Sequence, residues 1–193
     1  MTRMCQLDGI DHALNKLSTK KIAIELGTYY AGWTKYLAEK FDYVISFQTP
    51  KKHKLNNVGS EEGEFSEEGL RWKEIMREKL PPEHQTYYSF DYLAELIEPH
   101  DNVLQLLHHS PPTVPFNYTF DLWTYDISRD PAEQLKQYKF WRNYGKPGSV
   151  MLMGIYHPQS YDNFEMTPQE FLDQINEKWE YVPNNKRYIC IYL

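Results

Sequence analysis

The 193-residue sequence predicts an α/β fold, with one doubly wound, mostly parallel sheet and an antiparallel hairpin at its C-terminal end. Two observations predict this class. Apolar strand patterns alternate with helical patterns along most of the chain, which is typical of strands joined by helical crossovers. Residues 179–193 then contain two strand patterns around a polar turn, which indicates a hairpin. No repeat or composition break divides the chain, so we expect a single domain over residues 1–193.

The first elements are a leading helix within residues 1–20 and one complete strand–helix–strand unit. In KIAIELGTYYAGWTKYLAEKFDYVISFQ (residues 21–48), a strand at 21–26 precedes a turn with two glycines, an amphipathic helix and a second strand at 43–47. Parallel pairing of two strands requires such a crossover. Because the second strand is apolar throughout, we expect both of its faces to be covered.

The polar residues 49–69 interrupt this alternation. A basic cluster is followed by a run of glutamates, and no apolar periodicity is present. Such a segment is typical of a solvated loop. It also fits a mobile lid over a ligand site, because long loops in compact domains are often functional.

The alternation then resumes toward the C-terminus. We expect helices around 72–80 and 90–97, and strands at 102–107, 120–126 and 149–155. A helix beginning at Pro131 is expected to end at GKPG (145–148). TPQE (167–170) has the pattern of a capping box, and the helix that it begins is expected to reach Trp179.

Charge and composition exclude several classes of protein. A net charge of -6 argues against general nucleic-acid binding, which depends on neutralising phosphates. No apolar run is long enough to span a membrane, and the N-terminus lacks the apolar core of a signal peptide. The two cysteines form no CxxC pair and no disulfide framework, so we expect a soluble cytoplasmic protein.

The turn after the first strand has the features of a ligand site. Ligands of open α/β sheets bind beyond the carboxyl ends of the strands, where the strand order reverses. Glu25, Gly27 and Gly32 are spaced E-x-G-x-x-x-x-G, which differs from the G-x-G-x-x-G pattern of dinucleotide-binding turns, and no Walker lysine follows. A carboxylate here would repel phosphate and suits an amine-bearing ligand.

Residues 24–48 resemble motif I and the following strand of class I S-adenosylmethionine-dependent methyltransferases. The resemblance is closest to the small-molecule O-methyltransferase-like branch, whose turn reads approximately EIGTYxGGST. The matching residues are Glu25, Gly27, Thr28, Tyr29, Gly32 and Thr34, whereas Ala31 and Trp33 depart from the pattern. FDLWTYD (120–126) and WRNYGKPGSVMLMGIY (141–156) resemble the fourth-strand and fifth-strand segments, and the hairpin is similar to the antiparallel seventh strand of this fold.

The resemblance implies S-adenosylmethionine as cofactor and assigns roles to individual residues. It places the cofactor amine near Glu25, the backbone of Gly27 against the cofactor, and the adenine near Ser110. The same turn adds Thr28, Tyr29 and Gly32 to the expected cofactor-binding residues. Asp126 is expected near the methionine moiety and the transferred methyl group, as a cofactor-binding and catalytic residue. Asp126 also fits a helix N-cap, because a helix is expected to begin a few residues later.

Gln48 departs from the family pattern. The family usually has an acidic residue at this position, which accepts hydrogen bonds from both ribose hydroxyls. Glutamine can accept one bond and donate one, without a charge. Exchanging a charge-assisted bond for a neutral one is expected to weaken cofactor binding by about 1 kcal/mol.

A second departure concerns metal ions. Relatives that use a divalent ion carry acids after the fourth and fifth strands, whereas residues 154–157 are Gly-Ile-Tyr-His. Asp126 and Asp130 alone would make a poor oxygen cage, so we expect no metal site. His157 then becomes a candidate general base, and an ordinary surface histidine is the alternative.

The leading hypothesis is therefore an S-adenosylmethionine-dependent methyltransferase that acts on a small-molecule acceptor. A non-catalytic module that keeps the fold for binding or assembly is the alternative, favoured by Gln48 and the missing acids. SPP (110–112) resembles the SPPY box of DNA amino-methyltransferases. That box follows the fourth strand and requires an aromatic residue next, whereas Thr113 follows here.

Overall fold

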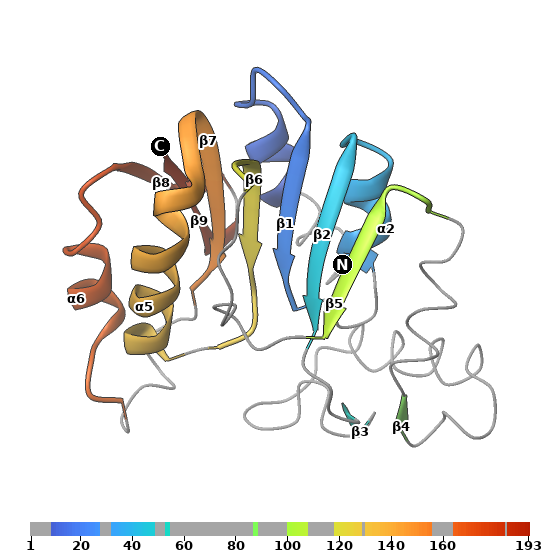
Figure 1. Cartoon of the computed structure of the whole chain (residues 1–193). Coiled ribbons are helices and arrows are strands. Elements are labelled where there is room, and N and C mark those ends of the chain that lie inside the picture. The colour runs from blue at the N-terminus through green and yellow to red at the C-terminus, as the bar shows by residue number, and fades with distance from the viewer. Residues whose placement is uncertain are drawn as a thin grey trace.

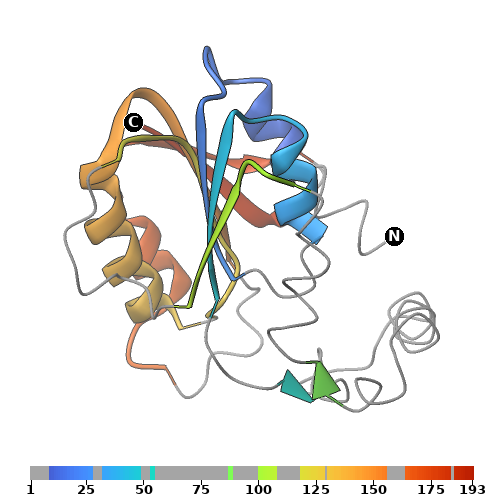
Figure 2. The same ribbon diagram turned by 45° about the vertical axis from the view of Figure 1, so that its right-hand side comes forward.

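The computed structural model describes residues 9–27, 32–48, 53–54, 87–88, 100–107, 118–128, 130–155, 164–183 and 185–193. Most of these residues belong to one seven-stranded sheet with helices on both faces, which confirms the predicted fold class (Figure 1, Figure 2). Across the sheet the strand order is β5-β2-β1-β6-β7-β9-β8. The strands are β1 (Ile22–Leu26), β2 (Tyr43–Gln48), β5 (Val103–Leu107), β6 (Phe120–Tyr125), β7 (Gly145–Gly154), β8 (Lys178–Val182) and β9 (Asn185–Tyr192).

The pairing of the strands combines a parallel body with one reversed strand. β5, β2, β1, β6 and β7 pair in parallel, and β9 is antiparallel to both of its neighbours, β7 and β8. The chain first places β2 and β5 on one side of β1, and then returns to place β6 on the other side. The strand order therefore reverses between β1 and β6, which is where an open α/β sheet binds its ligands.

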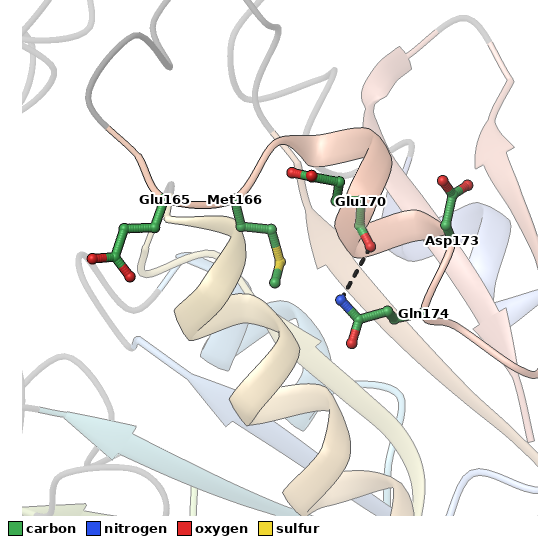
Figure 3. A pocket seen from close by; sticks show the side chains of 5 residues that line it. All are labelled: Glu165, Met166, Glu170, Asp173 and Gln174. Atoms are coloured by element: carbon green, nitrogen blue, oxygen red, sulfur yellow. Dashed lines mark hydrogen bonds between the residues drawn. The ribbon is translucent and has the colours of Figure 1, made fainter.

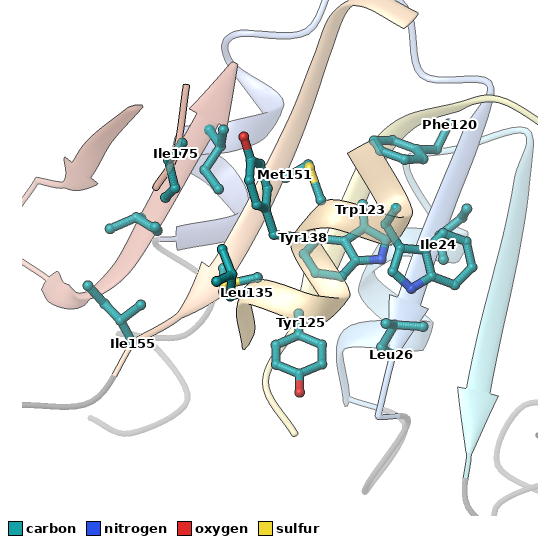
Figure 4. Packing of buried hydrophobic residues seen from close by; sticks show 14 of the residues in the cluster. Ile24, Leu26, Phe120, Trp123, Tyr125, Leu135, Tyr138, Met151, Ile155 and Ile175 are labelled. Carbon is teal, nitrogen blue, oxygen red and sulfur yellow. The ribbon is translucent and has the colours of Figure 1, made fainter. Parts of the chain in front are cut away.

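Alternating side chains of the central strands build two hydrophobic layers. On one face, Ile24 and Trp123 pack with residues from α5 (Pro131–Trp141) and α6 (Pro168–Leu172) (Figure 4). On the other face, Ala23 and Leu122 pack with residues from α2 (Gly32–Ala38) and from the helical residues 9–14. Val44, Ile45, Ser46 and Phe47 are all buried, so β2 is covered on both faces as predicted.

The helix α5 begins as predicted, and the helical residues end at GKPG as predicted. Asp130 is its N-cap, with a carboxylate oxygen that accepts from the backbone nitrogen of Ala132 at 2.9 Å. The helix ends at Trp141 and is followed by the short 3-10 helix η3 (Arg142–Tyr144). GKPG directly follows the helical residues, since η3 ends at Tyr144, but it also opens β7, with Gly145 opposite Phe120, so the strand begins before the predicted residue 149.

The capping box at Thr167 is confirmed, but the extent of its helix was wrong. The Thr167 side chain accepts from the backbone nitrogen of Glu170, and the Glu170 side chain accepts from the backbone of Thr167. α6 ends at Leu172, and Trp179 lies in β8 opposite Ile191. Pairing with β9 therefore overrides the helical spacing of these residues.

Several predicted elements lie outside the described residues. They are the helices at 72–80 and 90–97 and most of the polar residues 49–69. Within 49–69 the structure describes β3 (His53–Lys54), which pairs antiparallel with β4 (Tyr87–Tyr88). In the part of the chain that the structure describes, no helix has the length and hydropathy needed to cross a membrane.

Candidate functional site

The carboxyl ends of β1 and β6 are neighbours at the point where the strand order reverses. Leu26 is paired with Tyr125, so Gly27 and Asp126 are the first residues beyond the two paired ends. The backbone nitrogen of Gly27 donates to the carbonyl of Phe47 at 2.9 Å, which ties the turn to β2 as well. The ends of β1, β2 and β6 therefore meet near Gly27, at the lower edge of the sheet in Figure 1.

Glu25 is a buried acid beneath this turn. Its side chain is 1% exposed, and its Oε2 accepts from the Thr34 hydroxyl at 2.5 Å and from the Ser46 hydroxyl at 2.7 Å. Burial raises the pKa of Glu25 to about 7, although the two hydroxyls favour the charged form. Its Oε1 is buried and has no hydrogen-bond partner among the described residues. A buried acceptor of this kind calls for a donor.

Gly27 adopts a backbone conformation that side chains disfavour. Its φ is +97°, and a Cβ at this position would lie 2.8 Å from Cγ1 of Ile127. Ile127 follows Asp126 and is 50% exposed. The turn after β1 and the loop after β6 thus approach each other closely, and glycine permits the approach.

Asp126 is held from two further strands. The Tyr188 hydroxyl on β9 donates to its Oδ2 at 2.8 Å. A Cβ on Gly154, at the end of β7, would lie 2.5 Å from its Oδ1, so the absence of a side chain makes room for the carboxylate. The alternative role of Asp126 as the N-cap of α5 was wrong, because Asp130 fills that position.

The other predicted site residues fall into two groups. Gly32 begins α2, and Gln48 ends β2 at the same edge of the sheet, with its backbone paired to Leu107. The remaining four residues lie outside the described part of the chain: Thr28, Tyr29, Ser110 and His157. The structure thus brings Glu25, Gly27, Asp126 and the end of β2 to one edge of the sheet.

Sequence reasoning assigned no role to four residues that shape this edge, Thr34, Ser46, Gly154 and Tyr188. Thr34 matched the motif that the turn resembles. Gly154 ends an apolar strand, and a glycine at such a place indicates that another group approaches the backbone closely. Ser46 and Tyr188 lie inside strands, and nothing local marks their contacts. Their partners are 21 and 62 residues away along the chain.

A shallow pocket of about 270 Å³ lies elsewhere, at α6 and the segment before it (Figure 3). Its lining residues are Glu165, Met166, Glu170, Asp173 and Gln174. Glu170 is already engaged in the capping box of α6. Among the described residues, no group of three or more histidine, cysteine or acidic side chains is arranged to hold a metal ion. The pocket is therefore an acidic surface feature, separate from the edge where β1 and β6 end.

Several solved structures that share this fold are methyltransferases. The N-methyltransferase NodS of Bradyrhizobium japonicum gives a TM-score of 0.58 at 7% identity, over 98% of this chain and 93% of that one. An rRNA methylase from Streptococcus thermophilus gives 0.54 at 12% identity, over 95% and 93% of the two chains. The O-methyltransferase TomG of Streptomyces achromogenes, solved in complex with SAM, gives 0.54 at 10% identity, over 98% and 79%. No protein-family model and no curated protein matches the sequence.

The strand order and these likenesses define the class of fold. The chain has the fold of class I S-adenosylmethionine-dependent methyltransferases, with the reversed strand β9 between β7 and β8. At these identities the likeness concerns the fold, and the function is argued from the residues at the carboxyl edge.

Proposed function

We propose that the protein binds S-adenosylmethionine and transfers its methyl group to a small-molecule acceptor, without a metal ion. The observation that carries the proposal is the buried Oε1 of Glu25, which has no partner among the described residues and belongs to a strand that is followed directly by a glycine with positive φ where the strand order reverses. An amine is the donor that best suits a buried carboxylate. The α-amino group of the cofactor supplies such a donor.

The residues present fit this cofactor. Glu25 would hold the amine, the backbone of Gly27 would approach the methionine portion, and Gln48 would face the ribose hydroxyls. Asp126 would lie near the reacting end, and the resemblance adds Thr28, Tyr29, Gly32 and Ser110. When bound, S-adenosylmethionine supplies a methyl group already activated on a sulfonium, so the task of the chain is to orient and to exclude water. His157 as general base belongs to the same proposal.

A small acceptor is favoured over a nucleic acid. Two of the similar structures are rRNA methyltransferases, but this chain has a net charge of -6. Nucleic-acid affinity depends on basic groups that neutralise phosphates. The resemblance to the small-molecule O-methyltransferase-like branch is also part of the proposal; it rests on the turn after β1 and does not define the acceptor atom. A cytoplasmic location is part of the proposal as well.

A non-catalytic module is the second candidate, and Gln48 favours it. An uncharged residue at the end of β2 is expected to weaken cofactor binding by about 1 kcal/mol. Binding without methyl transfer to any acceptor would support this candidate.

Thermal unfolding with S-adenosylmethionine and with S-adenosylhomocysteine tests the proposal. Ligand at about 100 times its dissociation constant stabilises the folded state by about 2.7 kcal/mol. Glu25→Gln is expected to lower the affinity for both compounds about tenfold, because the amine loses a charged partner. Glu180→Gln is the matched control, since Glu180 lies on β8 and its side chain is 37% exposed.

The wild-type protein and the control should show the same shift in melting temperature. Absence of a shift with both compounds contradicts cofactor binding. An equal shift in Glu25→Gln contradicts the role of Glu25.

A further inference from the structure

Three strands meet at the carboxylate of Asp126. Asp126 directly follows β6, Gly154 ends β7, and Tyr188 lies in β9, where it is paired with Gly154. The Tyr188 hydroxyl donates to Oδ2 of Asp126 at 2.8 Å, across 62 residues of chain. This contact links the reversed strand β9 directly to the loop after β6.

The ring of Tyr188 is fixed in place by its surroundings. Tyr188 is 5% exposed, and its ring centroid lies 5.9 Å from that of Trp33, at the start of α2. A Cβ on Gly154 would lie 3.3 Å from its Cε1, and a Cβ on Gly9 would lie 3.7 Å from its Cγ. Elements from both ends of the chain therefore hold the ring, and the hydroxyl has little freedom to leave Asp126.

The carboxylate itself is placed at the rim of the site. Asp126 is half-buried, and the next residue, Ile127, is 50% exposed. Ser128, which lies between Ile127 and α5, is also held in place. The Gln134 side chain donates to the carbonyl of Ser128 at 2.9 Å and to that of Gly154 at 2.8 Å. A fixed anionic group therefore adjoins an exposed apolar side chain.

We propose that Tyr188 is a positioning residue that holds the Asp126 carboxylate as the anionic end of an acceptor subsite for an amine. The inference rests on the proposed function, since it names the chemistry of the acceptor. The ammonium group would bind the carboxylate, and the apolar part of the acceptor would lie against Ile127. The ammonium must lose a proton before its nitrogen reacts. The N–H bond breaks, its electron pair stays on nitrogen, and Asp126 takes the proton, so for an amine acceptor Asp126 replaces His157 as the base.

Three probes of similar size test the subsite: benzylamine, benzyl alcohol and benzoate. Their binding is measured by NMR titration and calorimetry on the full chain, both free and saturated with S-adenosylhomocysteine. Benzylamine is expected to bind about tenfold more tightly than the alcohol, because a charge-assisted bond replaces a neutral one, and benzoate is expected to bind most weakly.

Variants that remove a single hydroxyl or a single charge distinguish a positioning role of Tyr188 from a purely structural one. Tyr188→Phe keeps the buried ring and is expected to weaken benzylamine about tenfold, while the dissociation constant of S-adenosylhomocysteine stays unchanged. Asp126→Asn is expected to abolish the preference for benzylamine over benzyl alcohol. Tyr192→Phe is the matched control, because Tyr192 lies on the same strand and its hydroxyl donates to Glu180 instead.

Each outcome of these measurements either supports or overturns the inference. Benzylamine binding that is selective and is lost in Tyr188→Phe, but not in Tyr192→Phe, supports it. Failure of benzylamine to bind, equal binding of the alcohol or benzoate, or unchanged binding in Tyr188→Phe overturns it. The affinity for S-adenosylhomocysteine is measured separately, so loss of cofactor binding with a selective amine subsite would overturn the proposed function alone.

Discussion

Glu25 links the proposed cofactor site to pH. Its pKa of about 7 results from burial, which the hydroxyls of Thr34 and Ser46 only partly offset. A cationic amine beside Oε1 favours the ionised form, so the pKa of Glu25 should fall when the ligand binds. Ligand binding and deprotonation of Glu25 are therefore coupled, and the ligand binds more tightly once the side chain is ionised.

This coupling gives a prediction for S-adenosylhomocysteine, which carries an α-amino group. Between about pH 6 and about pH 7.5 its affinity should rise roughly eightfold, because the ionised fraction of an acid with a pKa near 7 rises by that factor. Above about pH 7.5 the rise should stop, because the α-amino group of the ligand, with an ordinary pKa of about 7.7–8.0, loses its own proton. Calorimetry across this range measures the effect.

Glu25→Gln is the control for this titration. The variant has no ionisable side chain at position 25, so the rise in affinity between about pH 6 and about pH 7.5 should be absent. A wild-type protein with the same flat profile would show that the amine does not contact Glu25.

At the scale of elements, the start of α5 determines how the loop after β6 is held. The Asp130 cap fixes the first turn of a helix that buries Leu135, Tyr138 and Trp141 against the sheet. Asp130→Ala is expected to lower the free energy of unfolding by about 1 kcal/mol, the usual cost of losing an N-cap. Urea denaturation measures this change.

Lys136→Ala is the matched control for the cap. Lys136 lies on the exposed side of the same helix and pairs with Glu133 at 3.4 Å. An exposed pair of this kind contributes less than about 0.5 kcal/mol. If both variants lose the same stability, the cap at Asp130 does not hold the helix.

The elements that were predicted correctly are those with local signals. The unit β1–α2–β2, the start of α5 and the capping box at Thr167 each depend on residues a few positions apart. The extent of α6 and the start of β7 depend instead on pairing with β9 and β6, which no local pattern records. Pairing between strands, and not the local spacing of residues, therefore determines where α6 ends and where β7 begins.

The residues of the candidate site also divide into those that a local sequence signal marks and those that no local signal marks. Glu25 and Gly27 were predicted because they lie at the end of the first strand, where ligands of such sheets bind, and Asp126 was predicted from the resemblance of residues 120–126 to the fourth-strand segment. Tyr188 was missed because its contact with Asp126 depends on β9 lying beside β7, far from β6 in sequence. A sequence pattern can mark the end of a strand, but it does not name the side chain that reaches that end from another strand.

At the scale of the whole molecule, acids with opposite pKa shifts determine how stability depends on pH. The pKa of Glu25 is raised to about 7, so its contribution to stability is present below about pH 4.5 and is lost as the pH rises through 7. For Glu180 the pKa is lowered to about 2, chiefly by the Tyr192 hydroxyl and then by His12. Its contribution is present above about pH 4.5 and is lost as the pH falls toward 2.

Asp121 is a third acid, and like Glu180 it has a lowered pKa. Asp121 at the start of β6 is buried, which by itself would raise its pKa, but bonds from Lys146 at 2.6 Å, from Thr19 and from the backbone of β1 lower it. Its contribution is therefore also lost in acid. The contacts of Glu180 and Asp121 connect the leading segment, the hairpin and the centre of the sheet. Loss of their contribution in acid therefore destabilises the whole fold.

Together these shifts predict a stability maximum at about pH 4.5 to 5, on the acid side of neutral. From about pH 8 to about pH 5 the free energy of unfolding should rise by about 3 kcal/mol, the value of a pKa difference between 4.5 and about 7 for one buried acid. Below about pH 4.5 it should fall again. The share of Glu180 in that fall is below about 1 kcal/mol, because its side chain is 37% exposed to solvent.

Urea denaturation at about pH 8, 5 and 3 checks this profile in three proteins. The wild-type protein should be most stable at the middle value. Glu25→Gln should lose the rise between the first two values and keep the fall at the third, because it removes only the acid with the raised pKa. Glu180→Gln should keep the rise and show a smaller fall. A wild-type protein that gains stability steadily up to about pH 8 would show that Glu25 is not desolvated in the folded state.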